Sequence, residues 1–143
     1  MSDAYPPIED LVPHGFPIRG LDELVDWAPG RATCRLTVHE ANPFVRDGAL
    51  PTVALLEYMA QAVAACLGYE AYRGGDGVRV GMLIGVRKME LTADTIPLGS
   101  ELSITVERSR GNEDVSTFEG VTELLGKRIA TAQMTLFHAE KPP

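Results

Sequence analysis

Residues 51–67 read PTVALLEYMAQAVAACL and form a long apolar stretch in this 143-residue chain. From Val53 onward, apolar side chains fall on every side of a helical wheel, and only Glu57 and Gln61 are plainly polar. A helix that is apolar all round is a buried helix. The stretch therefore predicts one long core helix, over about residues 52–72, around which the rest of the chain folds.

Glu57 is the unusual residue of this predicted helix, because a buried carboxylate loses its hydration. Such a residue has either a hydrogen-bonding partner or a chemical role. Gln61 lies four residues further on, which places its amide on the same helical face as the carboxylate. Two interpretations stay open from the residues alone: a core glutamate satisfied by hydrogen bonds, and a group that transfers protons in a reaction.

Composition and charge limit the classes of protein to which the chain can belong. The chain is 45% hydrophobic and 23% charged, which is typical of an ordinary globular protein, and its length predicts a single domain over residues 1–143 with loose ends at 1–7 and 139–143. The formal net charge of -7 argues against nucleic acid as a partner. The acidic, proline-containing N-terminus does not resemble a secretory signal, so we expect a cytoplasmic protein without membrane insertion.

Cysteines and histidines give no sign of a metal or cofactor site. Cys34 falls in a strand-like run and Cys66 in the apolar helix, and both are expected as small core residues rather than a disulfide. His14, His39 and His138 stand far apart without the spacing of metal ligands. We therefore expect no metal and no cofactor.

The remainder of the chain reads as strands. Residues 31–38, RATCRLTV, alternate between apolar and polar side chains, which predicts a half-buried strand, and the turn residues at 27–30 join it to a strand near 21–25. After the helix, the apolar run at 78–91 predicts one strand. The segments 102–107, 115–125 and 128–137 predict three further strands that form an antiparallel meander. An α+β fold results, with one antiparallel sheet wrapped around one helix.

Several short motifs in this order resemble a known family. They are LVPHGFPIRGLDELVDW at 11–27, NPF at 42–44, LPTVALLEYMAQA at 50–62, LIGVRKMEL at 83–91 and IPLGSEL at 96–102. Together they are similar to the hotdog-fold 3-hydroxyacyl-acyl-carrier-protein dehydratases. The resemblance implies a dimeric hotdog fold and dehydration of a 3-hydroxyacyl thioester to the trans-2-enoyl thioester, in fatty-acid or polyene-type biosynthesis.

One family residue has no counterpart here. In the family, a histidine just before the helix removes the C2 proton, and a helix carboxylate handles the departing hydroxyl. Glu57 matches the carboxylate, but the segment before the helix reads FVRDGALP, at 44–51, and contains no histidine. Such a shortened loop resembles the divergent dehydratase branch of aryl-polyene pathways.

Three interpretations follow from this mismatch. In the first, His14 supplies the missing imidazole and the chain is an active dehydratase. In the second, the chain is a non-catalytic or half-site subunit, and a related chain supplies the histidine. In the third, the protein is an acyl thioesterase that needs only a helix carboxylate and a water, with Asn42 and Asp47 as accessory polar groups; both residues are also common turn formers.

The substrate in all three cases is an acyl thioester on acyl carrier protein or coenzyme A, bound by a homodimer or by a heterodimer with a related hotdog subunit. The amides at the helix start would polarise the thioester carbonyl, because N–H groups of a first helical turn lack intrahelical acceptors. The acyl chain would run along the apolar helix. The expected substrate-binding residues are Thr52, Val53, Leu56, Met59, Ala60 and Gln61.

Overall fold

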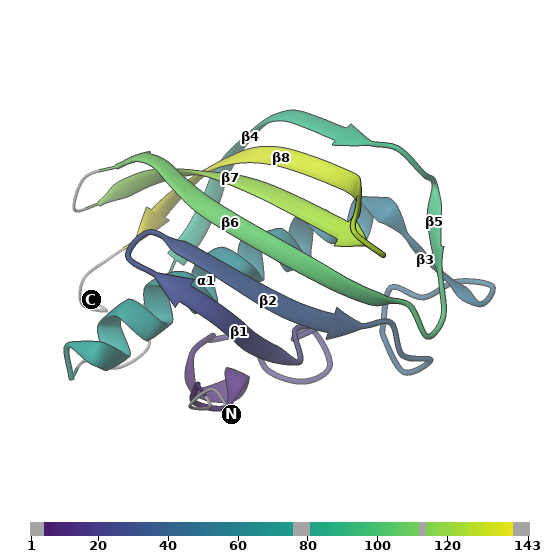
Figure 1. Ribbon diagram of the computed structural model, residues 1–143, viewed down its shortest axis with the longest axis horizontal. Coiled ribbons are helices and arrows are strands. Elements are labelled where there is room, and N and C mark those ends of the chain that lie inside the picture. The colour runs from purple at the N-terminus through teal and green to yellow at the C-terminus, as the bar shows by residue number, and fades with distance from the viewer. Residues whose placement is uncertain (1–4, 76–80, 112–113, 139–143) are drawn as a thin grey trace.

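A curved antiparallel sheet wraps around one long helix in the computed structural model of the protein, which describes residues 5–75, 81–111 and 114–138 (Figure 1). The helical elements are η1 (Ile8–Asp10), η2 (Thr52–Ala54) and α1 (Leu55–Arg73). The strands are β1 (Glu23–Ala28), β2 (Arg31–Thr37), β3 (Ala49–Pro51), β4 (Gly81–Leu91), β5 (Thr95–Pro97), β6 (Glu101–Gly111), β7 (Val115–Leu124) and β8 (Lys127–His138). This is the predicted α+β hotdog architecture.

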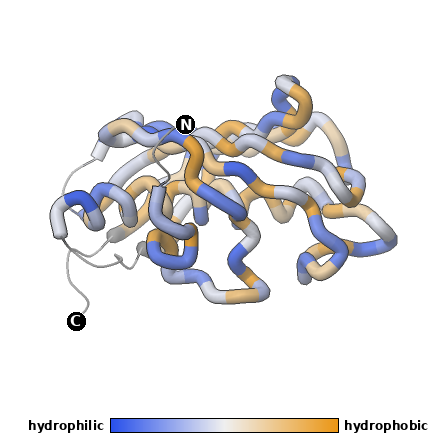
Figure 2. Tube along the Cα trace, turned by 60° about the horizontal axis from the view of Figure 1, so that its bottom comes forward, coloured by the Kyte–Doolittle hydropathy of each residue, from blue (hydrophilic) through white to orange (hydrophobic). Residues whose placement is uncertain are grey.

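The main sheet has the strand order β1-β2-β6-β7-β8-β4, with every neighbouring pair antiparallel. The predicted first hairpin is confirmed as β1–β2, and the predicted meander as β6–β7–β8. Ala32, Cys34 and Leu36 of β2 are buried, as their alternation indicated, and the changing colour along the strands is visible in Figure 2. The order leaves β1 and β4 at the two edges of the sheet.

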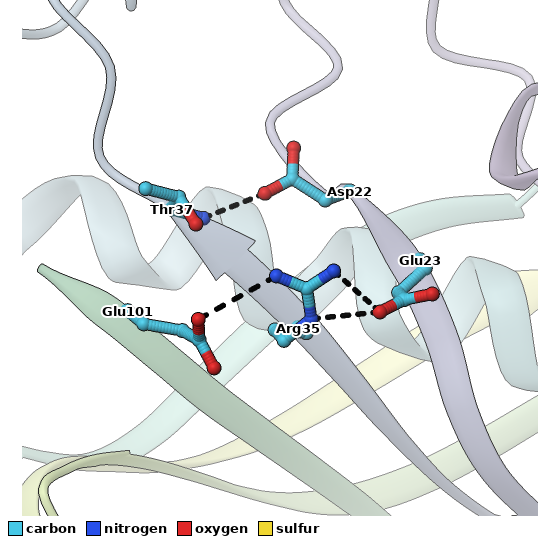
Figure 3. Close-up of polar contacts among 5 residues, drawn as sticks. All are labelled: Asp22, Glu23, Arg35, Thr37 and Glu101. Atoms are coloured by element: carbon cyan, nitrogen blue, oxygen red, sulfur yellow. Dashed lines mark hydrogen bonds and ion pairs between the residues drawn. The ribbon is translucent and has the colours of Figure 1, made fainter. Parts of the chain in front are cut away.

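The solvent face of the sheet carries charged side chains. Figure 3 shows Arg35 of β2 between Glu23 of β1 and Glu101 of β6, and its Nε donates to Glu23 Oε1 at 2.7 Å. Beside them, Asp22 Oδ2 accepts a hydrogen bond from the Thr37 N–H at 2.7 Å. This last contact fixes the end of the loop that precedes β1 to the end of β2.

Helix α1 begins and ends close to the predicted residues, but its start differs in detail. The single turn η2 precedes it, the Thr52 side chain donates to the Ala93 carbonyl at 2.7 Å, and no side chain caps either η2 or α1. The helix ends at a pair of glycines, since Gly74 is the C-cap and Gly75 adopts a φ of 83°.

Eleven of the 19 residues of α1 are buried against the sheet and the N-terminal loop. By length and composition the segment Thr52–Arg73 could cross a membrane, yet 67% of its most apolar window is buried inside the fold. It is the core helix of the hotdog fold. The burial is not complete, however, because Leu56, Ala60 and Ala64, spaced four residues apart, are only partly covered.

Two short strands were not predicted. Residues of β3 pair with β5 in a separate two-stranded sheet, which buries Leu50 and Ile96. Before β3, Asp47 and Gly48 have φ values of 53° and 75° and lie between the mutual backbone hydrogen bonds of Arg46 and Ala49. Asp47 is therefore a turn residue, which agrees with the simpler of its two interpretations.

Tyr5, within the segment expected to be loose, contacts the core helix. The ring of Tyr5 packs edge-on against Tyr69 of α1 at 5.1 Å between centroids, so the chain is already held to the helix there. The described residues exclude 1–4 and 139–143, the first part of the predicted strand at 78–91, and residues 112 and 113 between two of the predicted strands.

Both cysteines are free and buried, as expected for core residues. Burial, together with the neighbouring Cys66 thiol, raises the pKa of Cys34 to about 12. Burial likewise raises the pKa of Cys66 to about 12, because desolvation outweighs the favourable charge of Arg108. At pH 8 neither thiol is ionised, and only the thiolate is a nucleophile.

We therefore expect no reaction of the native protein with Ellman's reagent at pH 8, and reaction of two thiols after unfolding in guanidinium chloride. The measurement is the absorbance of the released thionitrobenzoate over an hour. Rapid labelling of the native protein would contradict the buried position of both residues.

Gly68 lies where the N-terminal segment crosses the helix. A Cβ at this position would overlap the Leu11 carbonyl group, which is backbone and cannot rotate away. Although alanine is favoured over glycine in a helix by about 1 kcal/mol, we expect Gly68→Ala to lower the free energy of unfolding by about 1–3 kcal/mol, as for other overpacked sites. Urea unfolding measures the change.

Gly15→Ala is the matched control, since a Cβ at Gly15 has no neighbour within 4 Å. It should change stability by less than about 0.5 kcal/mol. Equal effects of the two substitutions would show that the crossing at Gly68 is not as close as described.

Candidate active site

The buried amide of Gln61 holds the loop after η1 against helix α1. Its Oε1 accepts a hydrogen bond from the Gly20 N–H at 3.0 Å, and its Nε2 donates to the Ile18 carbonyl at 2.9 Å and to Glu57 Oε2 at 2.7 Å. The backbone partners show which atom of the Gln61 amide is the oxygen, because the Gly20 N–H can only donate and the Ile18 carbonyl can only accept. The amide is fully buried and both of its polar atoms are bonded.

Gly20 permits this close approach of loop and helix. A Cβ on Gly20 would overlap the ring of Tyr58, which is fully buried in α1. Residues 12–20 contain two prolines and two glycines, and the Phe16–Pro17 peptide bond within this loop is cis. The loop is thus anchored at its end by Gln61 and by the Asp22–Thr37 contact shown in Figure 3.

This anchoring brings His14 to Glu57. His14 Nε2 lies 3.6 Å from Glu57 Oε2, although the two residues are separated by 43 positions in the chain (57 − 14). The other ring nitrogen, Nδ1, is buried and has no hydrogen-bond partner among the described residues. The two predicted catalytic residues are therefore neighbours, and the imidazole presents one nitrogen to the carboxylate.

Glu57 is less buried than the sequence indicated. Its side chain is 36% exposed and that of His14 is 30% exposed. The expectation of a glutamate enclosed by the core was wrong because the sheet covers only part of the helix surface, and Glu57 lies at the border of the covered part. Its carboxylate is held by a buried amide on one side and is open on the other.

On its open side Glu57 lines a pocket of about 470 Å³ with a mainly apolar wall. The pocket lies at the start of the helix, between the 42–51 loop and strand β4. Its lining residues are Phe44, Arg46, Pro51, Val53, Ala54, Leu56, Glu57 and Leu83. A pocket of this size can hold a small acyl group, with a carboxylate at one side and a cation, Arg46, in its lining.

Asn42 ties the same loop to the helix. Its Oδ1 accepts from the Phe44 N–H at 2.8 Å, and its Nδ2 donates to the Tyr58 hydroxyl at 2.7 Å. Burial raises the pKa of Tyr58, and the nearby Glu57 charge adds to this, while the Asn42 hydrogen bond acts in the opposite direction. Tyr58 is therefore a neutral phenol at physiological pH. Asn42 forms a turn, as one interpretation held, and also binds a helix side chain.

The structure places the predicted substrate-binding residues in two groups. Val53 and Leu56 line the pocket, and Val53 is 64% exposed. Met59 and Gln61 are fully buried and lie outside the lining of this pocket, so their contact with an acyl chain stays a prediction. A Cβ built on Gly120 would lie 2.9 Å from Met59 Sδ, which places Met59 against the sheet.

The two amides at the helix start differ in their hydrogen bonding. The Thr52 N–H donates to the Asp94 carbonyl at 3.0 Å, so it is not the free amide that was expected. The Val53 N–H belongs to the first turn, where amides have no intrahelical acceptor. Ala60 is half-buried and lies outside the lining of this pocket.

Sequence reasoning missed Phe44, Arg46 and Leu83 as pocket residues. Phe44 and Arg46 belong to the shortened loop, whose sequence carries no pattern that marks them as pocket residues. Leu83 reaches the pocket only because β4 returns beside the helix, and no local pattern reveals that. Among the described residues no group of three or more His, Cys, Asp or Glu side chains is arranged to hold a metal ion.

With this geometry in place, comparison with known proteins identifies the family. The family model described as ApeP-like, ApeP dehydratase, matches residues 6–142. The chain belongs to the ApeP-like dehydratase family. It is also 26% identical over 142 residues to the 3-hydroxyacyl-[acyl-carrier-protein] dehydratase FabZ of Francisella philomiragia, with 89% of this chain and 86% of that protein covered.

Solved structures agree with this assignment. The dehydratase heterocomplex ApeI:P from Xenorhabdus doucetiae contains a chain that is 26% identical, with a TM-score of 0.90 and coverage of 96% of this chain and 93% of that one. An HP0420 homologue from Helicobacter felis, 17% identical with a TM-score of 0.70, covers 100% of this chain and 96% of its own. At that identity the second likeness shows the hotdog fold alone.

Replacement of Gln61 tests the anchoring of the site. Gln61→Leu keeps the approximate volume but leaves the Gly20 N–H and the Ile18 carbonyl without partners. Unpaired buried groups cost about 1–3 kcal/mol each, so we expect a loss of about 3 kcal/mol in the free energy of unfolding. Hydrogen exchange of the Gly20 amide should accelerate more than that of amides in β6 and β7. Uniform acceleration throughout the chain would contradict a local anchoring role.

Proposed function

We propose that the protein dehydrates a 3-hydroxyacyl thioester to the trans-2-enoyl thioester, with His14 and Glu57 as the catalytic residues. The observation that carries the proposal is the 3.6 Å separation of His14 Nε2 and Glu57 Oε2 beside an apolar pocket. His14 takes the role of the histidine that the shortened loop lacks. The FabZ and ApeI:P relatives support the same reaction class.

The reaction needs one base and one acid at the start. In the reactive state His14 is a neutral imidazole and Glu57 carries a proton. His14 removes the C2 proton, the C2–C3 double bond forms, and the C3 hydroxyl leaves as water with the proton of Glu57. Since Oε2 already accepts a hydrogen bond from Gln61, the proton of the acid is best placed on Oε1.

After water leaves, the pair holds the same number of protons as before, but on the opposite partners. His14 is then an imidazolium and Glu57 a carboxylate. Transfer of one proton from Nε2 to the carboxylate restores the reactive state, and a water that bridges the 3.6 Å separation of the two groups would carry this proton. The pair thus returns to its starting state without exchange of a net proton with solvent.

The thioester lies at the start of the helix in this proposal. Its carbonyl oxygen accepts a hydrogen bond from the Val53 N–H, near the positive end of the helix dipole, where enolate charge develops. The acyl group occupies the apolar pocket along Val53, Leu56 and Leu83. The carrier is acyl carrier protein or coenzyme A, and we place the protein in the cytoplasm, where such carriers operate.

A second copy or a related hotdog subunit completes the assembly in this proposal. Met82, Ile84 and Val86 of the edge strand β4 are exposed, and the partly covered Leu56, Ala60 and Ala64 lie on the helix face left open by the sheet. An edge strand with exposed apolar side chains is suited to pairing with another edge. The ApeI:P relative is a heterocomplex, which supports a related chain as the partner.

Substitution of Glu57 separates catalysis from stability. Glu57→Gln keeps the size of the side chain but removes its titratable proton, so dehydration should fall by about a hundredfold or more. The melting temperature should stay nearly the same or rise slightly. The assay follows enoyl-thioester absorbance, with free thiol release measured in parallel to detect thioester hydrolysis. Unchanged dehydration would overturn the catalytic role of Glu57.

His14→Ala distinguishes an internal base from a base on a partner chain. With His14 as the base, turnover falls by about a hundredfold and the melting temperature changes little, because the side chain is partly exposed. His39→Ala, in another loop and outside the lining of the pocket, is the matched control and should retain activity. Full activity of His14→Ala in the presence of a histidine-containing homologue would favour the half-site interpretation.

A charged substitution in β4 tests whether the protein associates through this strand. Ile84→Lys places an ammonium group among the exposed apolar side chains of the edge strand and should shift the protein from dimer to monomer at micromolar concentration. Sedimentation velocity measures the shift. Leu125→Lys, at the exposed β7–β8 turn, is the control and should leave the association state unchanged. A monomeric wild type would contradict the proposed assembly.

A further inference from the structure

Arg46 is the cation in the lining of the pocket beside Glu57. It lies in the turn before β3, where its N–H donates to the Ala49 carbonyl at 2.8 Å and its own carbonyl accepts from the Ala49 N–H at 3.1 Å. Strand β3 leads directly into η2, which contains Val53. The backbone of Arg46 is therefore fixed to the segment that forms the start of the helix, where the thioester is proposed to lie.

The turn holds one nitrogen of the Arg46 guanidinium. Nη1 donates to the Pro43 carbonyl and to the Val45 carbonyl, both at 2.8 Å. These two bonds use both hydrogens of Nη1 and fix the planar group. Within the described part of the chain, Nε and Nη2 have no hydrogen-bond acceptor, and no carboxylate forms an ion pair with Arg46. One edge of the guanidinium, with two parallel N–H donors, is thus open.

An open guanidinium edge is unusual in this chain, whose formal net charge is -7. Arg31, Arg35 and Arg108, for comparison, each form an ion pair with a carboxylate. The fork of two N–H groups on an arginine matches the spacing of two oxygens of a phosphate or a carboxylate. Arg46 is therefore suited to an anion that a ligand supplies.

The position of Arg46 indicates which anion this is. Arg46 is exposed, whereas Ala54 in the same lining is buried and Glu57 is partly buried, so the guanidinium lies at the solvent side of the pocket. A thioester bound with its acyl group in the apolar part of the pocket has its carrier arm directed toward solvent. The first anionic group along that arm is the phosphate of 4′-phosphopantetheine, which acyl carrier protein and coenzyme A share.

We propose that the Nε–Nη2 edge of Arg46 binds the phosphate of the 4′-phosphopantetheine arm, and that Arg46 is a specificity-determining residue for phosphorylated carriers over bare pantetheine. This inference rests on the proposed function in that the pocket is taken to hold the thioester. It concerns the carrier arm and places no restriction on the acyl group.

Unreactive thioesters test the inference separately from catalysis. Hexanoyl-4′-phosphopantetheine and hexanoyl-pantetheine differ only by the phosphate, and neither carries the 3-hydroxyl group that leaves in dehydration. Titration calorimetry on the assembled protein gives a Kd for each. We expect the wild type to bind the phosphorylated compound about tenfold more tightly, because hydrogen bonds between charged groups are the stronger ones. In Arg46→Gln the two Kd values should become nearly equal.

Two further variants separate charge from structure. Arg128→Gln makes the same change at an exposed arginine of β8 outside the pocket lining, and should leave the ratio of the two Kd values unchanged. Arg46→Lys keeps the charge but lacks the two-donor edge, so the ratio should fall by a smaller factor than in Arg46→Gln. If circular dichroism shows that Arg46→Gln does not fold, Arg46→Lys is measured in its place, with the same direction expected.

Hexanoyl-coenzyme A, which adds a nucleotide beyond the same phosphate, distinguishes the sources of the anion. We expect Arg46→Gln to weaken its binding by the same factor as that of hexanoyl-4′-phosphopantetheine. A loss confined to the coenzyme A compound would assign Arg46 to the phosphates of the nucleotide and would overturn the inference.

The outcomes also separate this inference from the proposed reaction. Equal binding of the two pantetheine compounds by the wild type, or a ratio unchanged in the Arg46 variant, would overturn the phosphate site. A phosphate preference that Arg46→Gln removes, together with no dehydration of 3-hydroxyhexanoyl-4′-phosphopantetheine by the wild type, would uphold the phosphate site and count against the proposed function alone.

Discussion

Burial of helix α1 is the constraint on which the rest of this fold depends. A helix with apolar side chains on nearly all sides must be surrounded, and a curved six-stranded sheet does this with a chain of 143 residues. The sheet leaves part of the helix surface uncovered. Glu57 lies at the border between the covered and the open surface, where a carboxylate is held by protein on one side and accessible to a ligand on the other. The position of the site thus follows from incomplete coverage of the helix.

Gln61 holds the residues of the site in place at this border. Its amide is satisfied by two backbone groups of the preceding loop and by Glu57, so one buried side chain fixes both the carboxylate and the segment that carries His14. A base from a distant part of the chain can occupy the catalytic position only if its loop is held in this way. The family histidine lost from the shortened loop is, in this account, replaced by a residue that the fold already places beside the helix.

The sequence predicted the fold more completely than the site, for reasons that particular residues illustrate. Period-two alternation in β2 and the long apolar run of α1 are local signals, and both elements formed where expected. Distant segments of the chain determine how far Glu57 and Met59 are buried and which carbonyl accepts from the Thr52 N–H. No local sequence pattern places those segments. The pair β3–β5 escaped prediction because its strands are only three residues long and each contains a proline. The sequence indicated a turn in this segment. It did not indicate that the turn would place Phe44 and Arg46 in the lining of the pocket.

The central claim is that His14 removes the C2 proton of the substrate while Glu57 protonates the departing hydroxyl, and chemical rescue tests it most directly. The rate of dehydration of 3-hydroxyhexanoyl-pantetheine by the His14→Ala protein is measured with and without free imidazole, and Glu57→Gln is measured in parallel. The account predicts that imidazole restores activity severalfold to His14→Ala, in which a space remains beside the carboxyl group, and restores none to Glu57→Gln. Activity of His14→Ala that equals the wild type without imidazole, or equal rescue of both variants, would contradict it.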